Sequence, residues 1–171
     1  MKSKNIIAAV LLVALLSGCL SGGNGTEEVR VPKIAYVPEG WIVRENPSQN
    51  MIVVFEASVD PEVDPDSANY IEIVYARVTS ELLGKDDDYE AQKKASTDAF
   101  KERLGFEPTE WTPIMIEGKK TPHMFGKKDS IFTCVDYSVH GSTLLKLYAQ
   151  HQPGGELHNN LVRIAESITF E

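Results

Sequence analysis

The sequence predicts an α+β fold, in which a mostly antiparallel β-sheet is flanked by helices. Short segments rich in β-branched and aromatic residues recur along the chain and are separated by Gly, Pro or charged turns, as is typical of strands. Two other segments carry apolar residues at helical spacing, and a series of strands lies between them. This order favours helices that are segregated on the faces of an antiparallel sheet. At 171 residues, one domain is the natural expectation.

The first 18 residues have the layout of a lipoprotein signal peptide. Lys2 and Lys4 precede an apolar run over residues 6–16, which ends in Leu16-Ser17-Gly18-Cys19, a lipobox. The run of 11 residues spans roughly 16 Å as a helix, about half of a bilayer core, so it does not fit a transmembrane helix. We therefore expect cleavage just before Cys19 and lipidation of that residue, which would hold the protein on the cell membrane, facing outside the cytoplasm.

Glycine and polar residues dominate residues 19–28, which predicts a flexible tether between the lipid and a folded domain over residues 29–171. The first strands are expected at residues 34–37 and 41–43, joined by the turn Pro38-Glu39-Gly40. Two further strands are expected at 51–57 and 70–78. A polar stretch with two prolines separates them and predicts a loop.

The clearest helix of the chain is predicted to follow Asp86-Asp87-Asp88. Aspartates suit a helix N-terminus because they accept hydrogen bonds from free backbone N–H groups and favour the positive end of the helix dipole. Gly105 is expected to end this helix. Between these ends the apolar residues recur at helical spacing, as Ala91, Ala95, Ala99, Phe100 and Leu104.

Strands are expected again at residues 109–116, 121–125, 131–140 and 144–150. For the last two we predict an antiparallel hairpin in which Val139 lies opposite Leu145 and Tyr137 opposite Leu147, with residues 141–143 as a three-residue loop. A second helix follows, with apolar positions at Leu157, Leu161, Ile164 and Ala165, and residues 167–170 close the chain as a short strand.

Charge and cysteine content limit the possible functions. The formal net charge is −8, and loss of Lys2 and Lys4 with the signal peptide makes it −10. A surface this acidic is repelled by nucleic acid, so we expect no nucleic-acid partner. The chain has two cysteines. With Cys19 lipidated, we expect Cys134 to be a small buried residue in a strand rather than a reactive thiol, and a disulfide between the two is the alternative.

The most suggestive group of candidate ligands is an alternating series of acidic residues in the first long loop. Hard cations such as Ca²⁺ bind several oxygen ligands, and alternate carboxylates can supply them from one side of a turning chain. The series departs from the EF-hand loop, because Pro61 and Pro65 interrupt it and the glycine of the sharp turn is missing. Its members are Asp60, Glu62, Asp64 and Asp66.

Other catalytic or metal-binding patterns are missing from the sequence. The four histidines, at positions 123, 140, 151 and 158, form no HExxH pair and no zinc spacing with Cys-x-x-Cys, and no Gly-x-Ser-x-Gly or complete phosphate-binding loop is present. The exterior side of the predicted late hairpin is a candidate binding face. It would present Asp136, Ser138, His140, Lys146 and Tyr148.

Short motifs at both ends of the domain resemble the PsbP-like family. Residues 36–41, Tyr-Val-Pro-Glu-Gly-Trp, are similar to the opening of these domains, and residues 165–170, Ala-Glu-Ser-Ile-Thr-Phe, are similar to their last strand after a helix. The resemblance covers residues 29–171. It implies an antiparallel sheet flanked by helices, a secreted accessory or binding protein, and no catalytic motif.

The sequence therefore predicts a lipid-anchored, extracytoplasmic accessory or binding protein that is not an enzyme and needs no cofactor. Its expected partners are the membrane, through lipidated Cys19, and another component of the cell envelope. The first alternative is a lipoprotein that binds a calcium-like metal or a small ligand through residues 60–66. Calcium calorimetry on the protein and on Asp64→Ala would separate the two. The second alternative is an enzyme with a dispersed active site.

Overall fold

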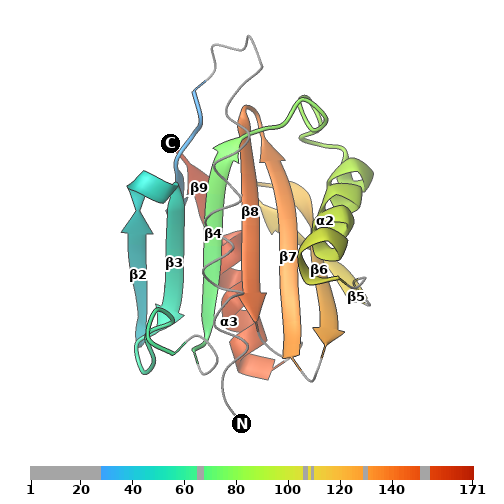
Figure 1. The fold of residues 1–171 in the computed structure, drawn as a ribbon. Helices are drawn as coiled ribbons and strands as arrows, with labels where there is room; N and C mark the ends of the chain where they lie inside the picture. Colours follow the sequence, from blue (N-terminus) through green and yellow to red (C-terminus); the bar gives the residue numbers. More distant parts are fainter. Residues whose placement is uncertain (1–27, 65–67, 106–107, 109, 129–130, 151–154) are drawn as a thin grey trace.

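A computed structural model describes residues 28–64, 68–105, 108, 110–128, 131–150 and 155–171 (Figure 1). Seven strands form one antiparallel sheet in the order β2-β3-β4-β8-β7-β6-β5, and β1 pairs with β9 in a second, two-stranded sheet. The mostly antiparallel α+β architecture is thus confirmed. The strands are β1 (Pro32–Ile34), β2 (Trp41–Asn46), β3 (Met51–Glu56), β4 (Tyr70–Arg77), β5 (Glu110–Ile116), β6 (Lys119–Lys128), β7 (Ile131–His140), β8 (Thr143–Gln150) and β9 (Ile168–Phe170).

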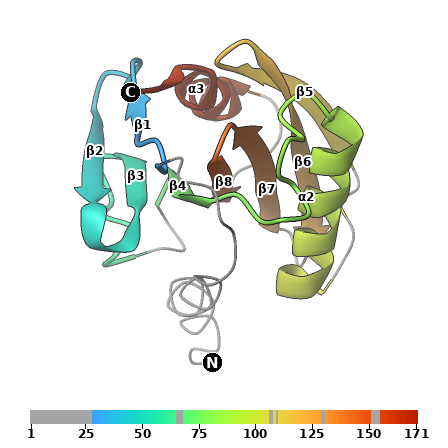
Figure 2. The same cartoon turned by 90° about the horizontal axis from the view of Figure 1, so that it is seen from above.

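Two α-helices cover opposite faces of the large sheet. Helix α3 (Gly155–Glu166) lies in the concave face together with β1 and β9, whereas α2 (Tyr89–Leu104) packs outside β6 and β7 (Figures 1 and 2). The main core lies on the α3 side and includes Ile73, Leu147 and Ile164, each at most 2% exposed. In the part of the chain that the structure describes, neither helix has the length and apolarity needed to cross a bilayer.

Helix α2 begins and ends where local signals predict. The Asp88 carboxylate accepts a hydrogen bond from the Ala91 N–H at 3.0 Å, and Gly105 adopts φ +71° while its N–H donates to the Lys101 carbonyl. The aspartate satisfies an N–H that has no partner within the helix, and glycine takes the left-handed conformation without a Cβ clash. The predicted helix is confirmed.

The predicted pairing of the late hairpin is wrong by one residue. Val139 lies opposite Leu144 and Tyr137 opposite Lys146, so the loop is the two-residue Gly141-Ser142, with Gly141 at φ +63°. The reason is that the sheet is buried on both faces here. Apolar residues of β7 pack toward α2, whereas the alternate apolar residues of β8, such as Leu145, pack toward α3. Matching one apolar face to the other therefore selects the wrong register.

The first two strands are joined by the predicted turn but belong to different sheets. The turn at Pro38–Gly40 is present, since the Trp41 N–H donates to the Pro38 carbonyl at 3.1 Å and Gly40 has φ +77°. However, β1 and β2 do not form a hairpin, because β1 pairs with β9 and β2 pairs with β3. The chain thereby places its first described strand beside its last.

Candidate functional site

Among the described residues of the acidic loop between β3 and β4, the carboxylates do not form a group of three that could hold one ion. The Arg44 guanidinium forms two hydrogen bonds with Asp60, of 2.6 and 3.1 Å, and lies 3.1 Å from the Glu62 carboxylate. Hydrogen bonding to Arg44 lowers the pKa of the Asp60 carboxyl. Asp64 is exposed, and Asp66 lies outside the described residues, as does Cys19.

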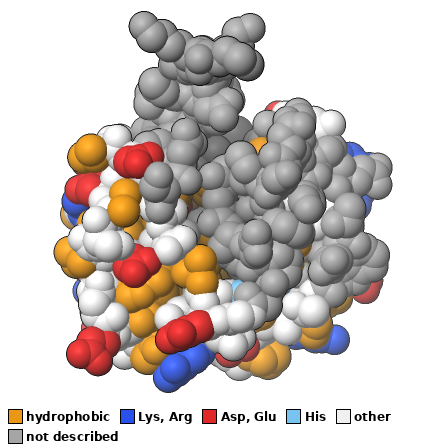
Figure 3. All heavy atoms as spheres, turned by 90° about the horizontal axis from the view of Figure 1, so that it is seen from below, with side chains coloured by type: hydrophobic (Ala, Val, Ile, Leu, Met, Phe, Trp, Pro, Cys, Tyr) orange, Lys and Arg blue, Asp and Glu red, His pale blue; other side chains and the backbone are white. Residues whose placement is uncertain are grey.

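Figure 3 shows the end of the molecule where this loop lies. Among the described residues in that view, acidic side chains form no continuous patch. On the side of β2 and β3, acidic side chains are scattered between apolar ones (Figure 3). Two of the four predicted calcium ligands share one arginine of β2 as their partner, and calcium binding by this loop stays a prediction.

The predicted binding face of the late hairpin is divided between the two sides of the sheet. Asp136 and His140 face α3 and are each 1% exposed, and Ser138 lies with them. Lys146 and Tyr148 lie on the opposite side, where the Lys146 Nζ stands 5.4 Å from the centre of the Tyr137 ring. The one-residue change in register causes this division. These residues do not form one solvent-exposed face.

Instead, the structure brings together three buried side chains from two neighbouring strands, His123 of β6 and Cys134 and Asp136 of β7. The His123 Nδ1 lies 2.6 Å from Asp136 Oδ2. The Cys134 Sγ lies 3.3 Å from His123 Nδ1 and 3.2 Å from Asp136 Oδ2. We call these residues the His–Cys–Asp cluster. Their ligand atoms all lie close enough to one another to contact one ion.

Each member of the cluster is held in place. The Met124 N–H donates to Asp136 Oδ1 at 2.8 Å, which leaves Oδ2 directed at His123 and Cys134. The His123 ring meets the edge of Phe125 at 4.5 Å between centroids and lies 5.7 Å from the ring of His158, which α3 provides. Burial raises the pKa of the Cys134 thiol well above its ordinary value, and the nearby Asp136 charge adds to the effect, so the sulfur carries its proton. The prediction that Cys134 is a small buried residue is confirmed.

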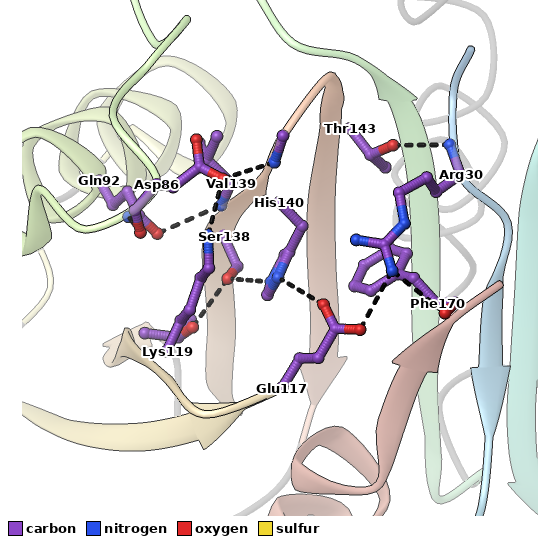
Figure 4. A network of polar contacts seen from close by, with 12 residues as sticks. Arg30, Asp86, Gln92, Glu117, Lys119, Ser138, Val139, His140, Thr143 and Phe170 are labelled. Atoms are coloured by element: carbon purple, nitrogen blue, oxygen red, sulfur yellow. Dashed lines mark hydrogen bonds and ion pairs between the residues drawn. The ribbon is translucent and has the colours of Figure 1, made fainter. Parts of the chain in front are cut away.

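A second polar array continues along the same face of β6 and β7 (Figure 4). Thr121 Oγ1 and Ser138 Oγ are 2.8 Å apart, and Ser138 Oγ lies 2.7 Å from His140 Nε2. The Glu117 carboxylate lies 3.5 Å from the other ring nitrogen of His140 and forms an ion pair with Arg30 at 3.2 Å. We call this set the His140 array.

The His140 array contains a hydroxyl, an imidazole and a carboxylate in sequence, which is also the order of a hydrolytic triad. However, Ser138 and His140 are each 1% exposed, and the Ser138 hydroxyl is shared with Thr121. Burial lowers the pKa of His140 to about 4, so its ring is neutral at neutral pH. The array is a buried hydrogen-bonded set of Thr121, Ser138 and His140, beside which the partly exposed Glu117 pairs with Arg30 of the N-terminal segment.

The sequence interpretation missed both sets for one reason. Cys134, Asp136, Ser138 and His140 occupy alternate positions of β7 and therefore share one side of the strand, and that alternation is visible in the sequence. A polar side usually faces solvent, and the interpretation assigned Asp136, Ser138 and His140 there. A cysteine and two histidines on adjacent strands were the available signal that this polar side is unusual.

The chain matches no family model, and no curated protein matches its sequence. Among solved structures, it is similar to a protein from Bacteroides thetaiotaomicron VPI-5482, determined at 1.50 Å resolution. The two share 8% sequence identity with a TM-score of 0.47, over 79% of this chain and 43% of the other. This chain therefore spans less than half the length of that protein.

Proposed function

We propose that this protein is a lipid-anchored, extracytoplasmic binding domain that assists another component of the cell envelope. The observation that carries the proposal is the lipobox at residues 16–19, which follows a short apolar segment and precedes a Gly-rich tether. The resemblance to PsbP-like domains is in line with the same role, since members of that family generally act as accessory or binding proteins.

The hydrogen bonds at the start of the folded domain indicate which end would face the membrane. The Ser142 hydroxyl donates to the Glu28 carbonyl at 2.6 Å, and the Arg30 N–H donates to Thr143 Oγ1 at 2.8 Å. The chain therefore enters the domain beside the β7–β8 turn. Residues 19–27 have a maximal extension of roughly 30 Å. In this proposal the β7–β8 turn lies toward the membrane, and the tether holds the domain close to other surface proteins, where effective concentration favours binding.

The positions of the possible nucleophiles support a binding role rather than catalysis. Cys134 and Ser138, the thiol and hydroxyl that lie beside histidines, are 2% and 1% exposed. A substrate would reach either side chain only if the structure around it opened. Binding through the domain surface requires no such opening.

Two linked experiments test the proposal. Mass spectrometry of the native protein should find a chain that begins at lipid-modified Cys19, and the Cys19→Ser variant should move from the membrane to the soluble fraction. Crosslinking in intact cells should then recover a specific neighbour with the wild type and much less of it with Cys19→Ser, which has the same domain without its anchor. An intact leader or an unmodified Cys19 would refute the anchor. Equal recovery from both proteins would refute the role of tethering.

A further inference from the structure

We propose that the His–Cys–Asp cluster binds one divalent metal ion of the zinc class. The inference uses only the folded domain and does not depend on the lipid anchor. It also differs from the calcium alternative in both place and chemistry.

The spacing of the three ligand atoms is close to that of a tetrahedral metal site. Zinc bonds of about 2.3 Å to sulfur and about 2.0–2.1 Å to nitrogen or oxygen place neighbouring ligand atoms roughly 3.3–3.6 Å apart. The sulfur of Cys134 lies 3.3 Å from His123 Nδ1 and 3.2 Å from Asp136 Oδ2, so two sides of the triangle are already near these values. The third side, from His123 to Asp136, is a hydrogen bond of 2.6 Å. Replacing its proton by an ion requires an opening of roughly 0.7 Å.

The types of donor atom favour zinc over calcium or magnesium. A thiolate, an imidazole and a carboxylate form a mixed sulfur, nitrogen and oxygen set, whereas Ca²⁺ and Mg²⁺ prefer oxygen alone. The Met124 N–H that binds Asp136 Oδ1 acts as an outer-shell partner, because it orients the carboxylate. All three ligands come from paired strands β6 and β7, which limits their movement.

Charge balance gives an independent reason for a divalent ion. The cluster lies in the core, where an unpaired charge is costly. A metal with charge +2 would neutralise one thiolate and one carboxylate while the imidazole stays neutral. Binding displaces the thiol proton of Cys134 and moves the shared proton off His123 Nδ1. The other ring nitrogen, Nε2, is buried and has no hydrogen-bond partner among the described residues, so it can accept that proton.

The test is a cobalt titration of the metal-stripped mature protein in detergent under reducing conditions. Cobalt replaces zinc in such sites and absorbs in the near ultraviolet when a thiolate binds it. If Cys19 is thioether-linked, Cys134 is the one free thiol of the protein. We expect this absorption to saturate at one equivalent and to disappear when zinc is added. Cys134→Ala should abolish the absorption. Asp136→Asn removes a direct ligand and should weaken cobalt binding at least ~100-fold, which is a larger loss than removal of an outer-shell partner causes.

Ser138→Ala is the matched control, because it removes a polar group two positions further along the same side of β7. It should retain one-equivalent binding with unchanged absorption. The measurement on the wild type is decisive even if a variant fails to fold. Absence of thiolate absorption at stoichiometric cobalt would overturn the proposal, as would absorption that persists in folded Cys134→Ala.

Discussion

The pH dependence of folding stability should reveal that His140 is buried in its neutral form. The ring lies against Phe170 at 4.6 Å between centroids and accepts or donates one hydrogen bond, with Ser138. Burial is the largest influence and lowers the pKa of His140 from 6.5 to about 4. Glu117 and Asp86 oppose this shift, whereas Lys119 and Arg30 reinforce it.

The sign and size of the effect follow from proton linkage. Between pH 4 and pH 6.5 the unfolded chain binds a proton at this histidine and the folded chain does not, so stability rises with pH across this window. The contribution of His140 is complete above pH 6.5 and is lost as the pH falls toward 4. A shift of this size corresponds to about 3 kcal/mol in total, of which about 2 kcal/mol is lost between pH 7.5 and pH 5.

Urea unfolding of the wild type and of His140→Gln at pH 7.5 and pH 5.0 measures this contribution. Glutamine does not titrate, and the other ionisable groups are common to both proteins, so their effects cancel in the difference. The stability gap between the two proteins at pH 7.5 should shrink by about 2 kcal/mol at pH 5.0. A gap that is the same at both pH values would refute the argument that burial keeps the ring neutral. An NMR titration of the His140 ring gives the pKa directly.

Substitutions at two positions test how the β7–β8 hairpin is held, through its contact with α2 and through the backbone of its turn. Gln92→Leu should lower the free energy of unfolding by about 2–3 kcal/mol, because buried Gln92 accepts from the Val139 N–H and donates to the Lys85 and Asp86 carbonyls, and denaturant unfolding would measure it. Gly141→Ala should cost about 1–2 kcal/mol through its left-handed backbone alone, since no atom lies within 4 Å of the added Cβ. Gly141→Asn should cost less in the same assay, and an equal loss would contradict the backbone explanation.

The parts of the fold that the sequence predicted are those with local causes. Helix α2 depends on Asp88 at its start and Gly105 at its end, and both act on backbone groups within one turn. The turn before β2 likewise depends on adjacent residues. The pairing of β1 with β9 joins segments that are far apart in the sequence, so no local pattern indicates it.

The acidic loop has a partner that its local pattern does not indicate. Alternate carboxylates at positions 60, 62 and 64 suggest a cation, and a cation is indeed present at Asp60 and Glu62. It is the guanidinium of Arg44, which comes from another strand and also lies over the Phe55 ring. This partner lies 16 positions before Asp60 in the sequence, so the alternation of the loop alone does not indicate it.

The polar side of β7 shows the reverse case, in which a local pattern looked ordinary and its surroundings made it unusual. Alternation places Cys134, Asp136, Ser138 and His140 on one side, but α3 and β9, which come later in the chain, cover that side. Once buried, each polar group needs a partner. At one end of the row, Thr121 and the Glu117 carboxylate surround Ser138 and His140. At the other end, a thiol and an imidazole converge on one carboxylate oxygen, an arrangement in which a divalent ion can displace the thiol proton and leave the site with no net charge. The two ends of one polar row therefore differ in chemistry, and the metal titration and the His140 pH experiment address them separately.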